Sequence, residues 1–165
     1  MANWCRNFLT FSGNQEQIEK VVSLFKDMHE KELATEHGQL PSFVSEKTHP
    51  AWIFEIEVDD DSDGHLSFST KYCPNVAVMV LIAETFNVSF EHEYEELGCL
   101  VYGKSEYDNG VLFTVDLERE DFDQFSYDEE KDRYLFRSKE YESDTEILET
   151  LLEEKIASTK EQMPI

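Results

Sequence analysis

The sequence predicts an α+β fold in which helices pack on one antiparallel sheet. Two stretches with apolar residues at helical spacing lie between stretches in which apolar and polar residues alternate, as in half-buried strands. The dipeptide Asn109-Gly110, flanked by apolar residues, is the strongest short signal for a β-hairpin. The 165 residues are enough for one domain with a core, and an apolar content of 40% argues against disorder.

The first strand and helix are predicted from the spacing of apolar residues, which changes from a strand pattern to a helix pattern. Residues 6–12 alternate and predict a strand. Gly13 ends it, and Asn14 with Gln17 three residues later resembles a capping box that starts a helix. The apolar stripe of this helix consists of Ile18, Val21, Val22, Phe25 and Met28. A stripe of this width is typical of a helix that lies on a sheet.

The next elements complete a known order. Alternation predicts strands over residues 52–58, 66–70 and 88–94. Between the last two, residues 75–85 are apolar nearly all round and predict a buried helix, with Pro74 in its first turn. The resulting order, β-α-β-β-α-β, is that of the ferredoxin-like sandwich.

The rest of the chain is predicted as an addition to this sandwich. The added elements are strands over 100–105, 111–117 and 134–137 and a C-terminal helix. Ser143 with Glu146 forms a capping box for that helix. We therefore expect a ferredoxin-like domain over residues 1–117, which includes the added β-hairpin. An acidic extension over 118–165, with the C-terminal helix, is expected to pack on the same domain.

Acidic residues are concentrated in the later part of the chain. The formal net charge is −23, and 30 of the 37 acidic residues follow residue 50, against 9 of the 14 basic ones. So one-sided a charge repels nucleic acid and anionic membranes and attracts basic surfaces. The charge therefore favours a basic protein partner and disfavours direct binding of nucleic acid.

Cysteine spacing and hydropathy indicate a compartment. Cys5, Cys73 and Cys99 form no C-x-x-C pair, so we expect reduced thiols rather than a disulfide framework or a zinc site. No N-terminal leader is evident, and no stretch approaches the roughly 20 apolar residues that a membrane span needs. We expect a cytoplasmic protein without membrane contact. The sequence does not predict its oligomeric state.

Two stretches of the chain, taken together, are similar to a known family. They are residues 1–13 and residues 66–107, in which Phe68-Ser69-Thr70 precedes the second helix and Phe90-Glu91-His92-Glu93-Tyr94 follows it. In these residues the chain resembles the YubB-like family, small proteins encoded by plasmids, phages and bacterial genomes. The resemblance implies a ferredoxin-like domain and a link to mobile genetic elements. It implies no activity, and it does not cover residues 118–165.

One acidic motif resembles a calcium loop. Asp59, Asp61 and Asp63 before Gly64 match the first positions of an EF-hand loop, but Thr70 stands where a bidentate carboxylate is needed. A polar hairpin turn explains the same residues, because Asp caps its own backbone and Gly adopts positive φ. Calcium at these three aspartates is therefore an alternative to the absence of any cofactor.

Paired glutamates occur on two predicted strands. Glu55 with Glu57, and Glu91 with Glu93, point outward from strands that the ferredoxin-like order places at the two sheet edges. We expect the pairs to lie apart and to protect those edges against aggregation. Acid–base chemistry would require a cleft and one raised pKa, so no catalytic residue is predicted.

The start of the extension is the best candidate for a partner surface. Residues 118–133 hold eight acids and three bases, with aromatic residues among them. Interfaces and cores use the same aromatic residues, so packing of these rings on the domain is an equal alternative. The candidate partner-binding residues are Glu118, Glu120, Asp121, Phe122, Asp123, Phe125, Asp128, Glu129 and Glu130.

Together these features favour a non-enzymatic, acidic interaction module of mobile-element type. We expect it to bind a basic host protein, such as one that itself binds nucleic acid, by charge mimicry. Two alternatives remain open. One is a metal-dependent (calcium or magnesium) or hydrolytic enzyme, and the other is a structural or assembly protein.

Overall fold

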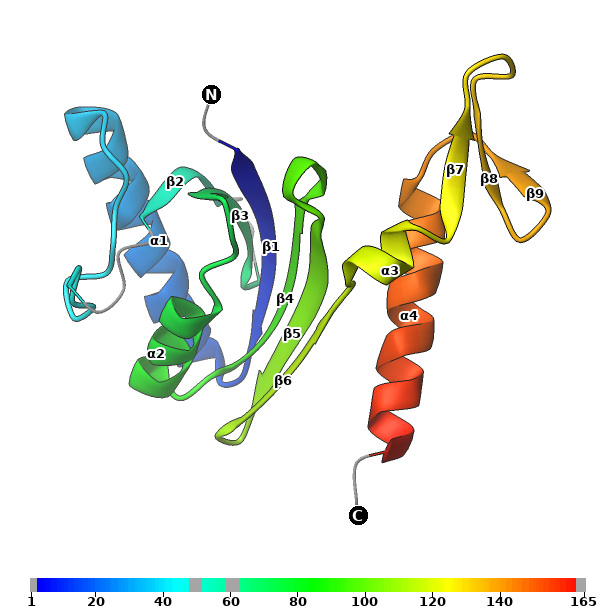
Figure 1. Ribbon diagram of the computed structural model, residues 1–165. Coiled ribbons are helices and arrows are strands. Elements are labelled where there is room, and N and C mark those ends of the chain that lie inside the picture. Colours follow the sequence, from blue (N-terminus) through cyan, green and yellow to red (C-terminus); the bar gives the residue numbers. More distant parts are fainter. Residues whose placement is uncertain (1–2, 48–51, 59–62, 163–165) are drawn as a thin grey trace.

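The chain folds around one six-stranded antiparallel sheet (Figure 1). The computed structural model describes residues 3–47, 52–58 and 63–162. The elements of the sheet layer and its helices are, in chain order, β1 (Trp4–Ser12), α1 (Gln15–Thr35), β2 (Ile53–Val58), β3 (His65–Lys71), α2 (Val76–Phe86), β4 (Ser89–Glu96), the 3₁₀ turn η1 (Leu97–Cys99), β5 (Val101–Asp108) and β6 (Val111–Asp116). The strand order is β2-β3-β1-β4-β5-β6. The first four strands have the ferredoxin-like order, so the predicted fold is confirmed.

Local signals explain where the two helices begin. The side chain of Asn14 accepts the backbone N–H of Glu16 at 2.9 Å, as expected of a residue that caps α1. The sequence predicts Pro74 in the first turn of α2, but Asn75 is the N-cap of that helix, so Pro74 lies before it. Both helices end at a residue with positive φ, Glu36 after α1 and Asn87 after α2.

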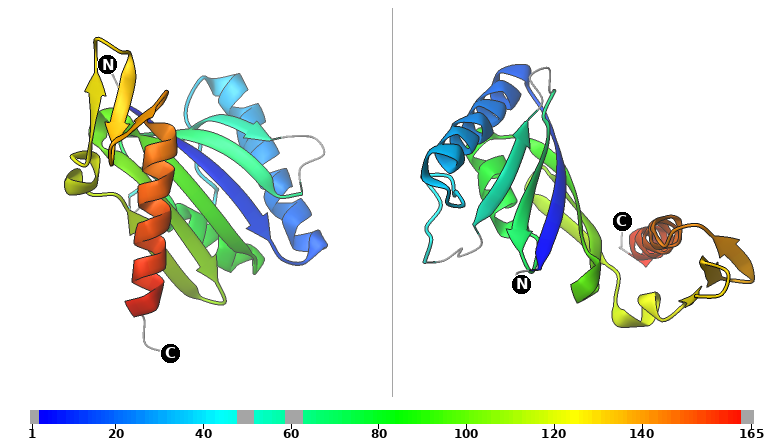
Figure 2. Two further views of the ribbon diagram at one scale, coloured as in Figure 1. Left: turned by 90° about the vertical axis from the view of Figure 1, so that its right-hand side faces the viewer. Right: turned by 90° about the horizontal axis from the view of Figure 1, so that it is seen from above.

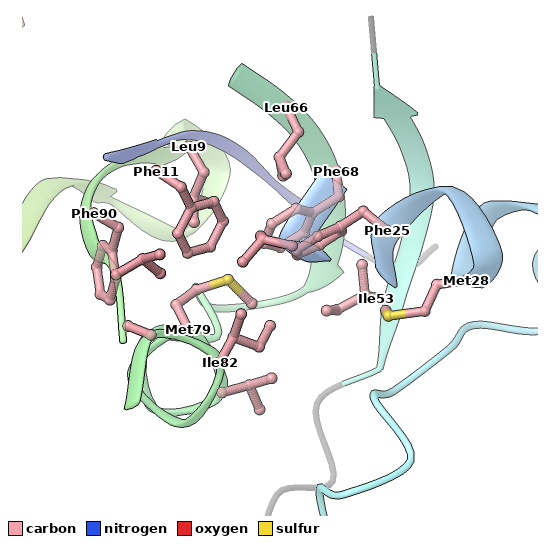
Figure 3. Close-up of a cluster of buried hydrophobic side chains, with 14 of the residues drawn as sticks. Leu9, Phe11, Phe25, Met28, Ile53, Leu66, Phe68, Met79, Ile82 and Phe90 are labelled. Atoms are coloured by element: carbon pink, nitrogen blue, oxygen red, sulfur yellow. The ribbon is translucent and has the colours of Figure 1, made fainter. Parts of the chain in front are cut away.

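The main core lies between the sheet and these two helices. Phe25 of α1 stacks on Phe68 of β3 with ring centroids 6.1 Å apart, and Phe11 of β1 lies against both Phe25 and Phe90 (Figure 3). Met79 of α2 is fully buried in the same cluster. Each such side chain contributes about 1.5–3 kcal/mol to stability through burial.

The place of the added hairpin differs from the expectation. β5 pairs with β4 along its length, from Phe90 opposite Tyr107 to Glu96 opposite Val101. The prediction that Glu91 and Glu93 lie on a sheet edge is therefore wrong. A hairpin signal predicts that its own two strands pair, but it does not predict which strand from earlier in the chain pairs with the hairpin.

A second, smaller unit follows the sheet. Its elements are α3 (Arg119–Phe122), β7 (Phe125–Asp128), β8 (Arg133–Phe136), β9 (Lys139–Tyr141) and α4 (Thr145–Gln162). The three strands form a separate small sheet. Its buried cluster consists of Val115, Leu117, Phe136, Ile147, Leu148, Leu151 and Leu152. Since Val115 belongs to β6, α4 and the small sheet are attached to the β5–β6 hairpin. Ser143 is not the residue that precedes α4, as the predicted capping box requires, because α4 begins at Thr145 and Asp144 precedes it.

The two faces of the six-stranded sheet are covered unequally. Helices α1 and α2 lie on one face, whereas α4 crosses the opposite face over β5 and β6 (Figure 2). The second face is left uncovered over β1, β3 and β4, and we call it the open face. Within the described residues, no helix has the length and apolar character to cross a membrane.

Candidate binding groove

The open face is hollowed around one exposed aromatic ring. Phe8, near the middle of β1, is 48% exposed and lines three adjoining cavities of ≈ 330, ≈ 510 and ≈ 250 Å³. The ≈ 510 Å³ cavity lies between the sheet and α4. We call these three cavities together the acidic groove. Its carboxylates are Glu55, Glu57, Glu91, Glu93, Glu95, Glu149 and Glu153.

Strand β4 supplies a row of three carboxylates. Glu91, Glu93 and Glu95 pair with Thr10, Phe8 and Arg6 of β1, and they alternate with buried His92 and Tyr94. Alternate residues of a strand lie about 6.8 Å apart on one face. The row therefore presents regularly spaced negative charges beside Phe8.

A β-bulge aims the carboxylates of β2 at the same face. Glu55 has φ 50°, and the pairing of β2 with β3 is interrupted between Phe54 and Glu57. The Glu32 carboxylate of α1 holds the bulge by accepting the N–H groups of Glu55 at 2.6 Å and Ile56 at 3.2 Å. Such a bulge re-aims the side chains that follow it.

Serines of β3 then fix these two carboxylates. Ser69 donates its hydroxyl to Glu55 at 2.7 Å, and Ser67 donates to Glu57 at 3.3 Å. Glu57 consequently shares the ≈ 330 Å³ cavity with Glu91 and Glu93. The two glutamate pairs are on strands that β3 and β1 separate, as expected, but Glu57 of one pair lines the same cavity as both members of the other.

Helix α4 forms the other wall of the groove. Glu149 and Glu153, one helical turn apart, face Phe8 and Glu95 across the ≈ 510 Å³ cavity. Burial, and then the charges of Glu149, Glu95, Glu93 and Asp144, raise the pKa of the Tyr102 hydroxyl to about 12. The negative field is thus concentrated where the helix meets the sheet.

Among the described residues two cations, Arg6 and Lys104, line the groove, and Lys104 forms the ion pairs there. The Lys104 ammonium lies 2.7 Å from Glu91, 3.4 Å from Glu93 and 3.9 Å from Glu106. The hydrogen bond from Lys104, and then its charge, lower the pKa of Glu91. Burial would lower the pKa of Lys104, but the hydrogen bond to Glu91 and the charge of Glu91 raise that pKa overall. Across the described residues, no Lys or Arg nitrogen comes within 4.0 Å of the other five carboxylates of the groove.

Several residues of the predicted tail surface have structural contacts instead. Asp121 accepts the N–H of Glu118 at 2.8 Å and pairs with Lys155 at 2.8 Å, which ties α3 to α4. Burial would raise the pKa of Asp121, but Lys155 and the N–H of Glu118 lower it overall. Phe122 and Phe125 pack against the second buried cluster.

The other tail candidates lie at the surface. Asp128 accepts the backbone N–H groups of Glu130 and Lys131 in the β7–β8 turn. The side chains of Glu120, Asp123, Glu129 and Glu130 are exposed, with no ion pair in the part of the chain that the structure describes. The predicted tail surface is therefore split between structural and solvent-exposed acids.

The calcium motif falls mostly outside the described residues. Asp59 and Asp61 lie there, and Asp63 is exposed just before β3. Among the described residues, no group of three His, Cys, Asp or Glu side chains is placed to hold a metal ion. Calcium at this motif stays a prediction.

Sequence reasoning identified four of the seven groove carboxylates but not the groove. The alternation of β4 continues to Glu95, and Glu149 with Glu153 forms an i, i+4 pair, so both signals were present. Glu149 and Glu153 come close to the carboxylates of β4 because α4 packs on the face of the sheet opposite α1 and α2. No local sequence pattern predicts this packing.

Comparison with known proteins agrees with this architecture. The model of the family described as the ferredoxin-like domain in Api92-like protein matches residues 51–137, more than half of the chain. This range runs from β2 to the end of β8. No curated protein and no solved structure matches the chain.

Proposed function

The chain belongs to the family of ferredoxin-like domains in Api92-like proteins, and for this member we propose a non-enzymatic function: binding a basic protein partner in the acidic groove. The groove holds seven carboxylates and two bases, Arg6 and Lys104, and among the described residues no Lys or Arg nitrogen lies within 4.0 Å of five of these carboxylates. Gathering like charges on one face costs free energy unless a ligand neutralises them.

The contrast with the tail carries this proposal. Most basic residues of the C-terminal unit are already paired with acids of the same unit or of β5. The pairs are Lys131–Glu140, Arg133–Glu142, Arg137–Glu154, Lys155–Asp121 and Lys160–Glu106. The bases of the tail are thus used within the protein, and the surplus tail acids, such as Glu129 and Glu130, are spread over an exposed surface, whereas the acids of the groove are gathered around one hollow.

The shape of the groove supports charge mimicry. A row of carboxylates at regular spacing on a rigid strand resembles the phosphates that a nucleic-acid-binding protein recognises. A host protein of that kind is the partner we propose, and nucleic acid itself is repelled by the same charges. The resemblance to YubB-like proteins adds a mobile-element origin to the proposal, and the reduced thiols add a cytoplasmic location.

Matched triple variants test the proposal. One set, Glu57→Gln, Glu93→Gln and Glu149→Gln, removes one charge from each of β2, β4 and α4. The control set, Glu120→Gln, Glu129→Gln and Glu130→Gln, removes the same charge from the exposed tail. We expect the groove set to weaken binding of a fluorescent oligolysine peptide about tenfold, measured by anisotropy at low salt, and the tail set to change it less than about twofold.

Two results would contradict the proposal. Equal weakening by both sets would mean that the protein acts only as bulk negative charge. Weakening by the tail set alone would place the partner on the surface that includes Glu129 and Glu130. A pull-down with the same variants, eluted by rising salt, then extends the comparison to the natural partner.

A further inference from the structure

The exposed ring of Phe8 is the feature of the groove that charge does not explain. A half-exposed Phe at the centre of a sheet forgoes part of the stabilisation that its burial would give. On the open face its cross-strand neighbours are Ser67, which is too short to cover a ring, and Glu93. The ring is therefore accessible at the floor of the groove.

Lysine side chains lie over aromatic rings elsewhere in this chain, in cation–π contacts. Lys71 lies 5.8 Å from the ring of Trp4 and 5.3 Å from that of Phe54, on the same open face as Phe8. Lys160 lies 5.2 Å from the ring of Phe113. In the described residues no cation is placed over Phe8.

Carboxylates stand on both sides of this ring. Glu57 reaches the hollow from the β2–β3 side, held by Ser67, and Glu93 reaches it from β4. Glu93 shares Lys104 with Glu91 but is the more distant of the two, at 3.4 Å against 2.7 Å. A flat cation on Phe8 would meet an acceptor at each edge.

We propose that Phe8 is the platform for an arginine side chain of the basic partner, with its guanidinium between Glu57 and Glu93. The inference rests on the proposed function and specifies its chemistry. A guanidinium is planar, stacks on aromatic rings and directs a fork of N–H donors at carboxylates. A lysine ammonium is a compact, strongly hydrated charge that gains less from a ring face.

The test compares fluorescent oligoarginine and oligolysine peptides of equal length. We expect the wild-type protein to bind the arginine peptide about five- to tenfold more tightly. Phe8→Leu should reduce this preference to less than about twofold and leave lysine binding unchanged. Phe43→Leu is the matched control, because Phe43 is 44% exposed and lies outside the groove, and it should keep the full preference. Circular dichroism of each variant confirms its fold.

The outcomes separate this inference from the proposed function. Equal binding of both peptides, with weakening by the triple groove variant, would overturn the arginine platform and leave the acidic groove in place. Equal loss of both peptides in Phe8→Leu would also overturn it, because the ring would then be a general apolar contact. Binding of neither peptide would overturn both.

Discussion

The open face and the C-terminal unit are both rich in acid, yet they arrange it in opposite ways. In the C-terminal unit, most bases are held by acids while the surplus acids stay at the surface: the Arg137 guanidinium, for example, reaches both oxygens of Glu154, at 2.6 and 2.8 Å. On the open face, seven carboxylates line one groove, which among the described residues also contains Arg6 and Lys104. Charge density alone therefore does not locate a binding surface, and carboxylates that gather around a hollow are the better guide.

The two regions also differ in what stabilises them. Among the described residues, eighteen buried residues form the core under α1 and α2, and seven form the cluster under α4. The first region is a deep core with a charged open face, whereas the second is a thin core tied down by ion pairs. The predictions below test this contrast, beginning with the largest effect.

Acid should destabilise the first region through His92. Its Nε2 lies 2.9 Å from Asn7 Oδ1, and Asn7 uses its own N–H groups on Cys5 and Thr70, so His92 is the donor. Its Nδ1 is buried without a partner in the described residues, and burial lowers the pKa of His92 to about 3. The unfolded chain therefore takes up this proton below about pH 6.5, while the folded chain does so only near pH 3.

The expected loss of stability is about 1.4 kcal/mol per pH unit below pH 6.5, or about 4 kcal/mol by pH 3.5. Urea unfolding between about pH 7 and pH 5 measures it. His92→Leu should lower stability at neutral pH, because it leaves Asn7 Oδ1 unpaired, and should remove this part of the pH dependence. His37→Gln, at an exposed position, should behave as wild type. An unchanged slope in His92→Leu would contradict the assignment.

The thin second core should fail separately from the first. Leu148 of α4 is 1% exposed, and Leu148→Ala should cost about 3 kcal/mol of stability through the cavity it creates. We expect amide hydrogen exchange to rise in α4 and β7–β9 while β1–β4 stays protected. Uniform loss of protection across the chain would show that the two regions unfold as one unit.

The β-bulge that orients Glu55 and Glu57 should depend on Glu32, a residue outside the groove. Glu32→Ala removes the acceptor for two backbone N–H groups of β2 and should cost about 2 kcal/mol. It should also weaken binding of basic peptides, because the side chains of Glu55 and Glu57 would no longer be oriented toward the groove. Glu30→Ala, an exposed change on the same helix, is the control. Full peptide affinity in Glu32→Ala would show that the bulge does not position these carboxylates.

Local patterns account for what the sequence predicted, and long-range packing accounts for what it did not. Strand alternation placed Glu91 and Glu93 outward, and Asn109-Gly110 located the hairpin turn between β5 and β6. Neither signal reports that β5 joins β4. Strands β7 and β9 have four and three residues, too short for a period to emerge. The contact of Asp121 with Lys155 spans 34 residues and has no local signature.

The smallest effect gives the sharpest separation of the two regions. Asp121 is acidic and lies in the predicted tail surface, but it accepts the N–H of Glu118 and pairs with Lys155. Asp121→Asn should cost about 1 kcal/mol of stability, the usual range for a cap and a partly exposed ion pair, without changing peptide affinity. Because the pKa of Asp121 is lowered in the folded state, this contribution should disappear as the pH falls through the carboxylate range.

Glu57→Gln is the matching change in the groove, since it also removes one charge from one carboxylate. It keeps the acceptor for Ser67 and relieves repulsion from Glu91 and Glu93, so stability should stay the same or rise slightly. Peptide affinity should fall, and fall more for arginine than for lysine. Thermal unfolding and anisotropy on the two variants measure both quantities. If Asp121→Asn weakens binding while Glu57→Gln weakens the fold, the roles assigned to the two regions must be exchanged.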